Sequence, residues 1–261
     1  MEELYTNSAK RRMLAGEKLT GCWIQTDNTI ATEILSNCGF DLLLIDCEHG
    51  PTEITRLISH FQAMNGTNCM PMVRAPWNDL VSIKRILDCG AMGIHIPYVN
   101  TYEEALNAVK ACKYPPEGFR GIAGSPRGNS YGGLKKNQYQ QRANQEILVV
   151  VAIETPQAVE ELDKMLTIDG LDGIFIGPMD LATTMGYFGN PKHPEVQKKI
   201  AEIEEKVFRN GTKLLGTVGG SPETANSLFE KGYSYVIMGS DERYVRQGAL
   251  NELKALKELR K

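Results

Sequence analysis

The chain has 261 residues, 42% of them hydrophobic, and a formal net charge of -3, which is enough apolar material for one large core and favours a single domain. No dense run of Lys and Arg marks a nucleic-acid surface, and no apolar stretch approaches the roughly 20 residues that cross a bilayer. The first residues lack the apolar core of a signal peptide. We therefore expect a cytoplasmic protein that acts on small molecules, with neither nucleic acid nor membrane as a partner.

Six cysteines lie in the first half of the chain, without the paired spacing of zinc or redox sites. We expect reduced core thiols rather than zinc ligands or disulfides. These cysteines are Cys22, Cys38, Cys47, Cys69, Cys89 and Cys112.

Short runs rich in Val, Ile and Leu alternate with amphipathic segments of helical length from about residue 20 onward, a pattern typical of parallel βαβ units. In chain order, eight strands are predicted at residues 21–25, 41–46, 70–74, 93–97, 147–154, 173–177, 213–218 and 233–239. Helices are predicted at 79–91, 101–112, 155–166, 193–210 and 221–232. Thr101 and Ser221 are expected to cap helix starts, and Gly211 and Gly232 to follow helix ends.

A weaker run at 119–124 is flanked by glycine and is interpreted as part of a loop. The Gly- and Ser-rich stretch 121–138 is interpreted as a mobile loop at the mouth of the fold. Eight strands that alternate with helices can close into a barrel or form an open doubly wound sheet. A single α/β (β/α)8 TIM barrel over residues 1–261 is favoured, because no G-x-G-x-x-G follows the first strand and no linker divides the chain.

Polar side chains stand where several of these strands end, which is the edge of a barrel that carries the active site. The second strand ends at Asp46 and the third at Arg74, while the fifth ends at Glu154 and the sixth runs on to Asp180. Glu154 and Asp180 are hard oxygen donors that can share Mg²⁺ or Mn²⁺. Alternatively, each caps the helix that follows it. An acid that ends an apolar strand is costly to bury unpaired, which favours the metal.

Arg74 has the fork of donors that grips a carboxylate, but a structural salt bridge to Asp46 or Glu48 is the alternative. Of the four histidines, His49 is best placed to move a proton, whereas His95 is interpreted as a hydrogen-bonded core residue. No predicted strand ends in the lysine of a Schiff-base aldolase, and no G-x-S-x-G or Walker loop is present. A metal-stabilised carbanion is the chemistry that remains.

At these residues the sequence resembles the HpcH/HpaI aldolase family, the metal-dependent class II pyruvate aldolases. The matching segments are residues 42–51, 73–99, 113–121, 153–162 and 170–196, of which the last is the most specific. The resemblance implies that Glu154 and Asp180 bind a divalent cation, either Mg²⁺ or Mn²⁺ with Co²⁺ as a third candidate. It also implies that Arg74 holds the carboxylate of pyruvate.

The resemblance further implies that His49 is the acid–base residue, aided by Asp46 and Asp88. The keto-acid pocket would be completed by the backbone of Gly177, Pro178 and Met179. It implies a homo-oligomer, a hexamer built from dimers, in which a C-terminal helix of about 241–258 is exchanged between partners. Two differences bear on the acceptor substrate: Ala152 stands where those aldolases place Gln, and the loop GIAGSPRGNSYGG departs from their pattern.

The implied reaction cleaves or forms a 4-hydroxy-2-oxo acid through a pyruvate enolate, with pyruvate or oxaloacetate and an aldehyde as the small-molecule partners. Decarboxylation of oxaloacetate gives the same enolate and is an expected side activity. One alternative is a CoA-ester lyase like the citrate lyase β subunit, or a synthase that condenses the enolate with another acceptor. The other is a non-catalytic barrel that binds keto acids.

Overall fold

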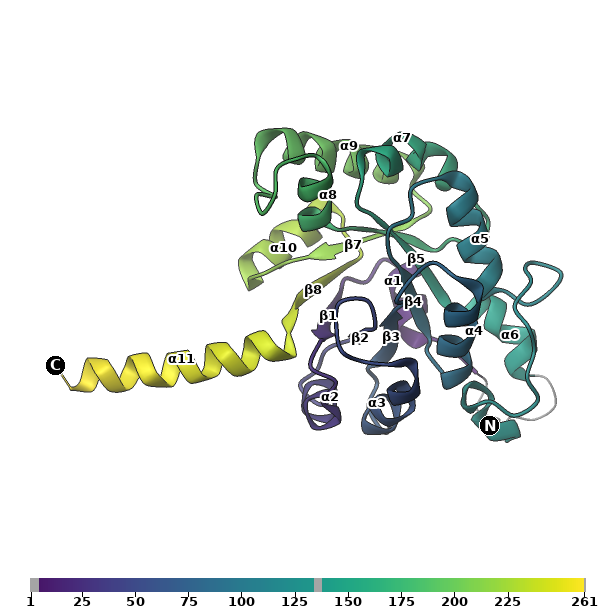
Figure 1. The fold of residues 1–261 in the computed structure, drawn as a ribbon, viewed down its shortest axis with the longest axis horizontal. Coiled ribbons are helices and arrows are strands. Elements are labelled where there is room, and N and C mark those ends of the chain that lie inside the picture. Colours follow the sequence, from purple (N-terminus) through teal and green to yellow (C-terminus); the bar gives the residue numbers. More distant parts are fainter. Residues whose placement is uncertain (1–4, 134–137, 261) are drawn as a thin grey trace.

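The computed structural model describes residues 5–133 and 138–260, and its centre is a closed parallel barrel (Figure 1). The strands pair in sequence order, and β1 pairs with β8 to close the ring. Each lies within two residues of its predicted bounds, which confirms the single (β/α)8 barrel. The strands are β1 (Leu19–Ile24), β2 (Leu42–Asp46), β3 (Met70–Arg74), β4 (Gly93–Ile96), β5 (Leu148–Ile153), β6 (Gly173–Ile176), β7 (Leu214–Val218) and β8 (Tyr235–Ser240).

Helices surround the barrel, and the five predicted between the strands are all present. The capping predictions are confirmed: Thr101 forms a capping box, Ser221 accepts from the backbone of its helix, and Gly211 and Gly232 take left-handed conformations. The helices are α1 (Ser8–Leu14), α2 (Thr29–Ser36), α3 (Leu57–Ala63), α4 (Leu80–Cys89), α5 (Tyr102–Cys112), α6 (Gln138–Glu146), α7 (Pro156–Met165), α8 (Pro178–Thr184), α9 (Pro194–Asn210), α10 (Pro222–Lys231) and α11 (Asp241–Leu259), with 3-10 turns η1 (Ile54–Arg56) and η2 (Arg127–Gly132).

Large side chains fill the inside of the barrel and give the site a solid floor. Trp23, Met72, Phe175 and Tyr235 come from four different strands and are all buried. The rings of Trp23 and Phe175 meet edge to face with their centroids 6.4 Å apart. A second core lies between the strands and the surrounding helices. All six cysteines are free thiols. Four are buried as predicted, whereas Cys89 is half-buried and Cys38 is exposed.

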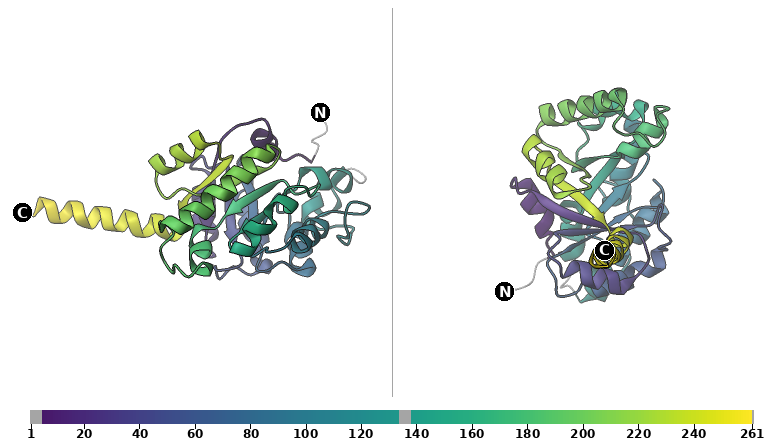
Figure 2. Two further views of the ribbon diagram at one scale, coloured as in Figure 1. Left: turned by 90° about the horizontal axis from the view of Figure 1, so that it is seen from above. Right: turned by 90° about the vertical axis from the view of Figure 1, so that its left-hand side faces the viewer.

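The last helix, α11, leaves the barrel after its first turn and extends away from it, as Figure 1 and the left view of Figure 2 show. Its first residue, Asp241, is buried, whereas Val245, Leu253 and Leu259 are exposed. An apolar surface on a projecting helix is typical of a segment that packs against another chain. Within the described residues, no helix is both long and apolar enough to cross a membrane.

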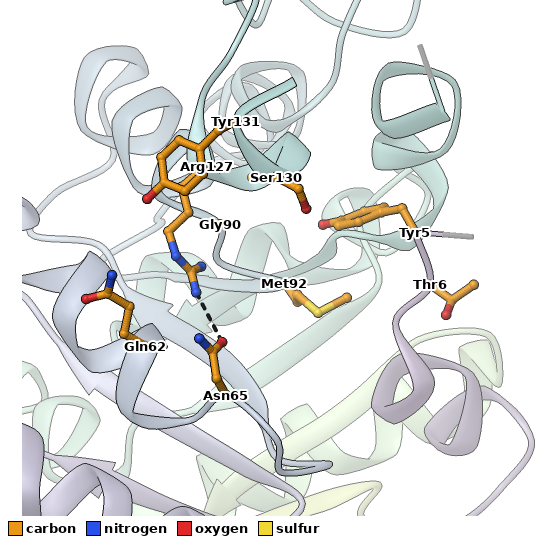
Figure 3. Close-up of a pocket in the computed structure, with 10 residues that line it drawn as sticks. Tyr5, Thr6, Gln62, Asn65, Gly90, Met92, Arg127, Ser130 and Tyr131 are labelled. Carbon is orange, nitrogen blue, oxygen red and sulfur yellow. Dashed lines mark hydrogen bonds between the residues drawn. The ribbon is translucent and has the colours of Figure 1, made fainter. Parts of the chain in front are cut away.

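The loop around residues 121–133 lies at the end of the barrel opposite the mouth, so its predicted place is wrong. It follows α5, which runs from the carboxyl end of β4 back to the amino end of β5. Figure 3 shows Arg127 and Tyr131 beside Gly90 and Met92, which directly precede β4, around a cavity of about 650 Å³. Residues 134–137 lie outside the described part.

Candidate active site

Asp46 and Arg74 form the central pair of the site at the carboxyl ends of β2 and β3. They are register partners on the two strands, and both are buried. Nε and Nη2 of Arg74 donate to Oδ1 and Oδ2 of Asp46 at 2.9 and 2.5 Å. Burial raises the pKa of Asp46, but the hydrogen bonds and charge of Arg74 outweigh it and lower the pKa to about 2. Asp46 therefore stays ionised and holds Arg74 in one orientation.

Glu48 and Trp23 complete the surroundings of the Arg74 guanidinium. Oε2 of Glu48 lies 3.0 Å from Nη1 of Arg74, and the guanidinium carbon lies 4.3 Å from the Trp23 ring centroid. Burial raises the pKa of Glu48, with Asp46 and Asp180 acting in the same direction and Arg74 against them. The salt bridges considered as the alternative role of Arg74, to Asp46 and to Glu48, are thus both present. They use one edge of the guanidinium and part of a second.

His49 lies at the rim with its side chain largely exposed. Its backbone N–H donates to Oδ1 of Asp46 at 3.2 Å, and its Nε2 lies 3.9 Å from Oε2 of Glu48. The turn after β2 therefore brings His49, Glu48 and Asp46 together.

Glu154 follows β5 and is buried with little to stabilise its charge. Its Oε2 accepts one hydrogen bond, from the backbone N–H of Tyr98 at 2.9 Å, and it forms no ion pair with a described residue. Burial raises the pKa of Glu154 to about 7, and the charges of Asp180 and Glu48 add to the increase. The charges of Glu48, from the turn after β2, and of Asp180, in the first turn of α8, therefore both act on Glu154.

Gly177, the residue after β6, lies directly against the side chain of Glu154. A Cβ atom at this position would lie 2.7 Å from both Cγ and Oε1 of Glu154. Pro178 and Asp180 then form the first turn of α8, while Met179 is exposed. Only glycine, which has no side chain, leaves room for the carboxylate of Glu154 in its present position. The glycine of the sequence Gly-Pro-x-Asp therefore allows β6 and Glu154 to approach this closely.

Several residues of the site were not identified from the sequence. Gln25 donates its amide to Oδ2 of Asp46 at 3.0 Å. Tyr98, whose backbone holds Glu154, has a φ of 52°, and its ring stacks on Trp77 at 5.9 Å. A left-handed conformation at a bulky residue is typical of functional sites. Trp77 and Tyr98 lie three and two residues after the ends of β3 and β4, and such aromatic residues past strand ends are the signal that would have identified this wall.

Asp88 and His95 depart from their predictions. Asp88 lies in the last turn of α4, away from the strand ends, where it accepts a hydrogen bond from buried Arg120 at 2.7 Å. Within one chain it does not join His49, because α4 carries it to the opposite end of the barrel. His95 is buried as predicted, but neither ring nitrogen has a hydrogen-bond partner among the described residues. Burial lowers its pKa to about 3, so it stays neutral.

Among residues 5–133 and 138–260, no group of three or more His, Cys, Asp or Glu side chains has the geometry to hold a metal ion. A cation at this rim would therefore depend on two carboxylates, with water and substrate as its further ligands.

Comparisons with known proteins identify the family of the chain. The sequence profile of the HpcH/HpaI aldolase/citrate lyase family matches residues 19–247. The 5-keto-4-deoxy-D-glucarate aldolase of Escherichia fergusonii is 40% identical over 246 residues, covering 94% of this chain and 95% of the relative.

Solved structures give the same picture. An HpcH/HpaI aldolase/citrate lyase family protein from Burkholderia cenocepacia superimposes with a TM-score of 0.91 at 31% identity, covering 98% of this chain and all of that one. The citrate synthase SbnG superimposes with a TM-score of 0.85 at 25% identity, covering 95% and 97% of the two chains. Aldolases of this family generally depend on a divalent metal ion and act on small keto acids. The chain belongs to the HpcH/HpaI aldolase/citrate lyase family, and its chemistry is that of a carbon–carbon lyase of the aldolase type.

Proposed function

We propose that the chain is a divalent-metal-dependent aldolase that cleaves or forms 4-hydroxy-2-oxo acids at the carboxyl ends of β2, β3, β5 and β6. The observation that carries the proposal is Glu154: a buried acid beside Asp180 and Glu48, without a cationic partner in the described part of the chain. Such a group of negative charges is costly unless a cation joins it. Arg74, whose guanidinium can bind a carboxylate, ends β3, which is separated from β5 by β4 alone.

Glu154 and Asp180 fit a hard dication. Both offer carboxylate oxygens, the ligands that Mg²⁺ and Mn²⁺ prefer, and Co²⁺ accepts the same set. When bound, the cation supplies Lewis-acid stabilisation of the negative charge that develops on the keto oxygen. Glu154 is buried and held by Tyr98, so the chain presents this ligand without rearrangement.

Arg74 is the group that binds the carboxylate of the 2-oxo acid. Asp46 occupies the edge formed by Nε and Nη2. A substrate carboxylate would bind at the second edge, formed by Nη1 and Nη2, and would displace Glu48, whose Oε2 lies 3.0 Å from Nη1. Glu48 lies near Nη1 on that side, and its raised pKa makes it a weaker competitor for the guanidinium than Asp46. Gly177, Pro178 and Met179 border the keto-acid pocket at the start of α8.

His49 moves the proton of the C4 hydroxyl, taking it up in cleavage and returning it in condensation. Its side chain is exposed at the rim, and its backbone is fixed to Asp46. The imidazole is therefore accessible to a substrate hydroxyl or to a bridging water.

For the substrate, we propose an oxo acid derived from a sugar acid, with 5-keto-4-deoxy-D-glucarate as the first compound to test. The support is the relative of that name at 40% identity. A synthase that condenses the same enolate with another acceptor is the second candidate, supported by the citrate synthase SbnG at 25% identity.

The test is a coupled assay of pyruvate release from a panel of 4-hydroxy-2-oxo acids, with and without a chelator. Cleavage should stop with the chelator and return with Mg²⁺ or Mn²⁺. Glu154→Gln should remove activity, because an amide is a much weaker ligand for a hard dication than a carboxylate. Glu160→Gln, on the exposed side of α7, is the matched control and should behave as wild type. Full activity of chelator-treated enzyme would refute the proposal.

We further propose that the chain assembles as a homo-oligomer, a hexamer built from dimers that exchange α11. The support is the projection of α11 away from its own barrel with Val245, Leu253 and Leu259 exposed.

A further inference from the structure

The buried first residue of α11 is bonded to the loop that follows β1. Oδ1 of Asp241 accepts the backbone N–H of Gln25 at 2.8 Å, and Oδ2 accepts the backbone N–H of Thr26 at 3.2 Å as well as its hydroxyl. Asp241 is 2% exposed and forms no ion pair with a described residue. Its charge is therefore stabilised by three neutral donors from one short segment.

The same segment reaches the central pair of the site. Nε2 of Gln25 donates to Oδ2 of Asp46 at 3.0 Å, and that oxygen also accepts Nη2 of Arg74 at 2.5 Å. The other oxygen of Asp46 accepts Nε of Arg74 and the backbone N–H groups of Glu48 and His49. A continuous line of hydrogen bonds thus runs from α11 to Arg74.

This line constrains the geometry of the site because the carboxylates at its two ends, Asp241 and Asp46, are buried, while Gln25 between them is half-buried. A buried carboxylate that loses a donor is left with an unsatisfied charge, so Asp241 and the backbone of Gln25 and Thr26 are held together. The position of the Gln25 backbone determines where its side-chain amide lies. That amide donates to Oδ2 of Asp46 and so completes the hydrogen bonds of the Asp46 carboxylate. Asp46 in turn determines where the guanidinium of Arg74 points.

We propose that Asp241 is a positioning residue, which connects the base of α11 to the carboxylate grip of Arg74 through Gln25 and Asp46. The proposal deepens the proposed function and rests on it in one respect, the role of Arg74 as the substrate-carboxylate group. Because the rest of α11 projects from the barrel, a partner that packs on α11 acts on the same line of bonds.

Replacement of Asp241 by Asn turns one of the two acceptor oxygens into an amide N–H₂, which then faces either the N–H of Gln25 or the donors of Thr26. We expect Asp241→Asn to raise the KM for the oxo acid and the Kd for pyruvate about tenfold, the scale of one hydrogen bond to a charged group. The kcat should change far less, because Arg74 holds the carboxylate equally in the ground state and in the transition state.

Two further variants separate positioning from a folding defect. Gln25→Met keeps the length of the side chain but removes its donor, and it leaves α11 untouched; it should raise KM and Kd by a similar factor. The double variant should be no worse than either single one, because both break the same line. Glu242→Gln, the next residue of α11, is the control and should match wild type, since its partner is the hydroxyl of Ser240.

Hydrogen exchange tests the line without any substrate. The backbone N–H groups of Glu48 and His49 donate to Asp46, so Asp241→Asn should speed their exchange, whereas Glu242→Gln should not. Unchanged exchange there overturns the proposal whether or not the chain turns over an oxo acid. Wild-type KM and Kd in Asp241→Asn, or losses that multiply in the double variant, overturn it as well. Failure of the wild-type enzyme to bind pyruvate with any metal would refute the proposed function instead.

Discussion

Gly177→Ala tests whether Glu154 must keep its place for activity. The added Cβ would lie 2.7 Å from Cγ and Oε1 of Glu154, where ordinary contacts begin at 3.4 Å, so the carboxylate must retreat by 3.4 − 2.7 = 0.7 Å. Its hydrogen bond from the Tyr98 N–H, now 2.9 Å, has little room to lengthen before it is lost. A displacement of about 1 Å in a catalytic group costs on the order of 10²-fold in rate.

We therefore expect Gly177→Ala to lower kcat about 10²-fold and to weaken Mn²⁺ binding, while the overpacking costs about 1–3 kcal/mol of stability and leaves the barrel folded. Pyruvate release at saturating substrate, calorimetric titration with Mn²⁺ and thermal melting measure the three quantities. Gly124→Ala is the matched control, because its Cβ would meet nothing within 4 Å. If Gly177→Ala bound Mn²⁺ and turned over like wild type, the placement of Glu154 would not matter, and its role as a metal ligand would have to be withdrawn.

Four other predictions concern single groups. Arg74→Lys should lose most of its activity, measured as kcat/KM, because a point charge cannot replace two parallel hydrogen bonds; a near-normal value would make Arg74 structural. His49→Ala should slow aldol cleavage by about 10²-fold or more but oxaloacetate decarboxylation far less, whereas equal losses would remove its role as the base. Leu253→Asp should reduce the oligomer seen by light scattering, and an unchanged mass would place the interface elsewhere. His95→Leu should raise the melting temperature, since two unpartnered ring nitrogens cost about 1–3 kcal/mol; a lower value would indicate a hidden partner for His95.

The sequence predicted the strands because most of their residues are buried, on both faces of the sheet, and so form mainly apolar runs. Phe175 and Ile176 show this directly, since one faces the inside of the barrel and the other the surrounding helices, and both are apolar. The strand ends followed from the same pattern, which is why Asp46, Arg74 and Glu154 were identified before their contacts were known.

The local hydrophobic pattern of the sequence could not predict contacts between residues that are far apart in the chain. The bond between Gln25 and Asp241 joins residues 216 positions apart, and no local spacing indicates it. Asp88 was assigned by resemblance alone, although its place late in α4 separates it from His49 within one chain. The loop of Arg127 was misplaced because composition marks a loop but not the end of the barrel on which it lies.

Asp46, the last residue of β2, and Glu154, the residue after β5, are both carboxylic acids, but their surroundings give them different properties. Asp46 faces a guanidinium and several N–H donors, and its pKa falls to about 2. Glu154 has a single N–H donor and two acidic neighbours, and its pKa rises to about 7. Pairs of carboxyl groups whose surroundings push their pKa values apart are characteristic of catalytic sites. The described residues already satisfy the charge of Asp46, which holds Arg74 in place. They offer the charge of Glu154 only one hydrogen bond and no cationic partner. A carboxylate that still lacks a positive partner is what a ligand for a divalent cation requires.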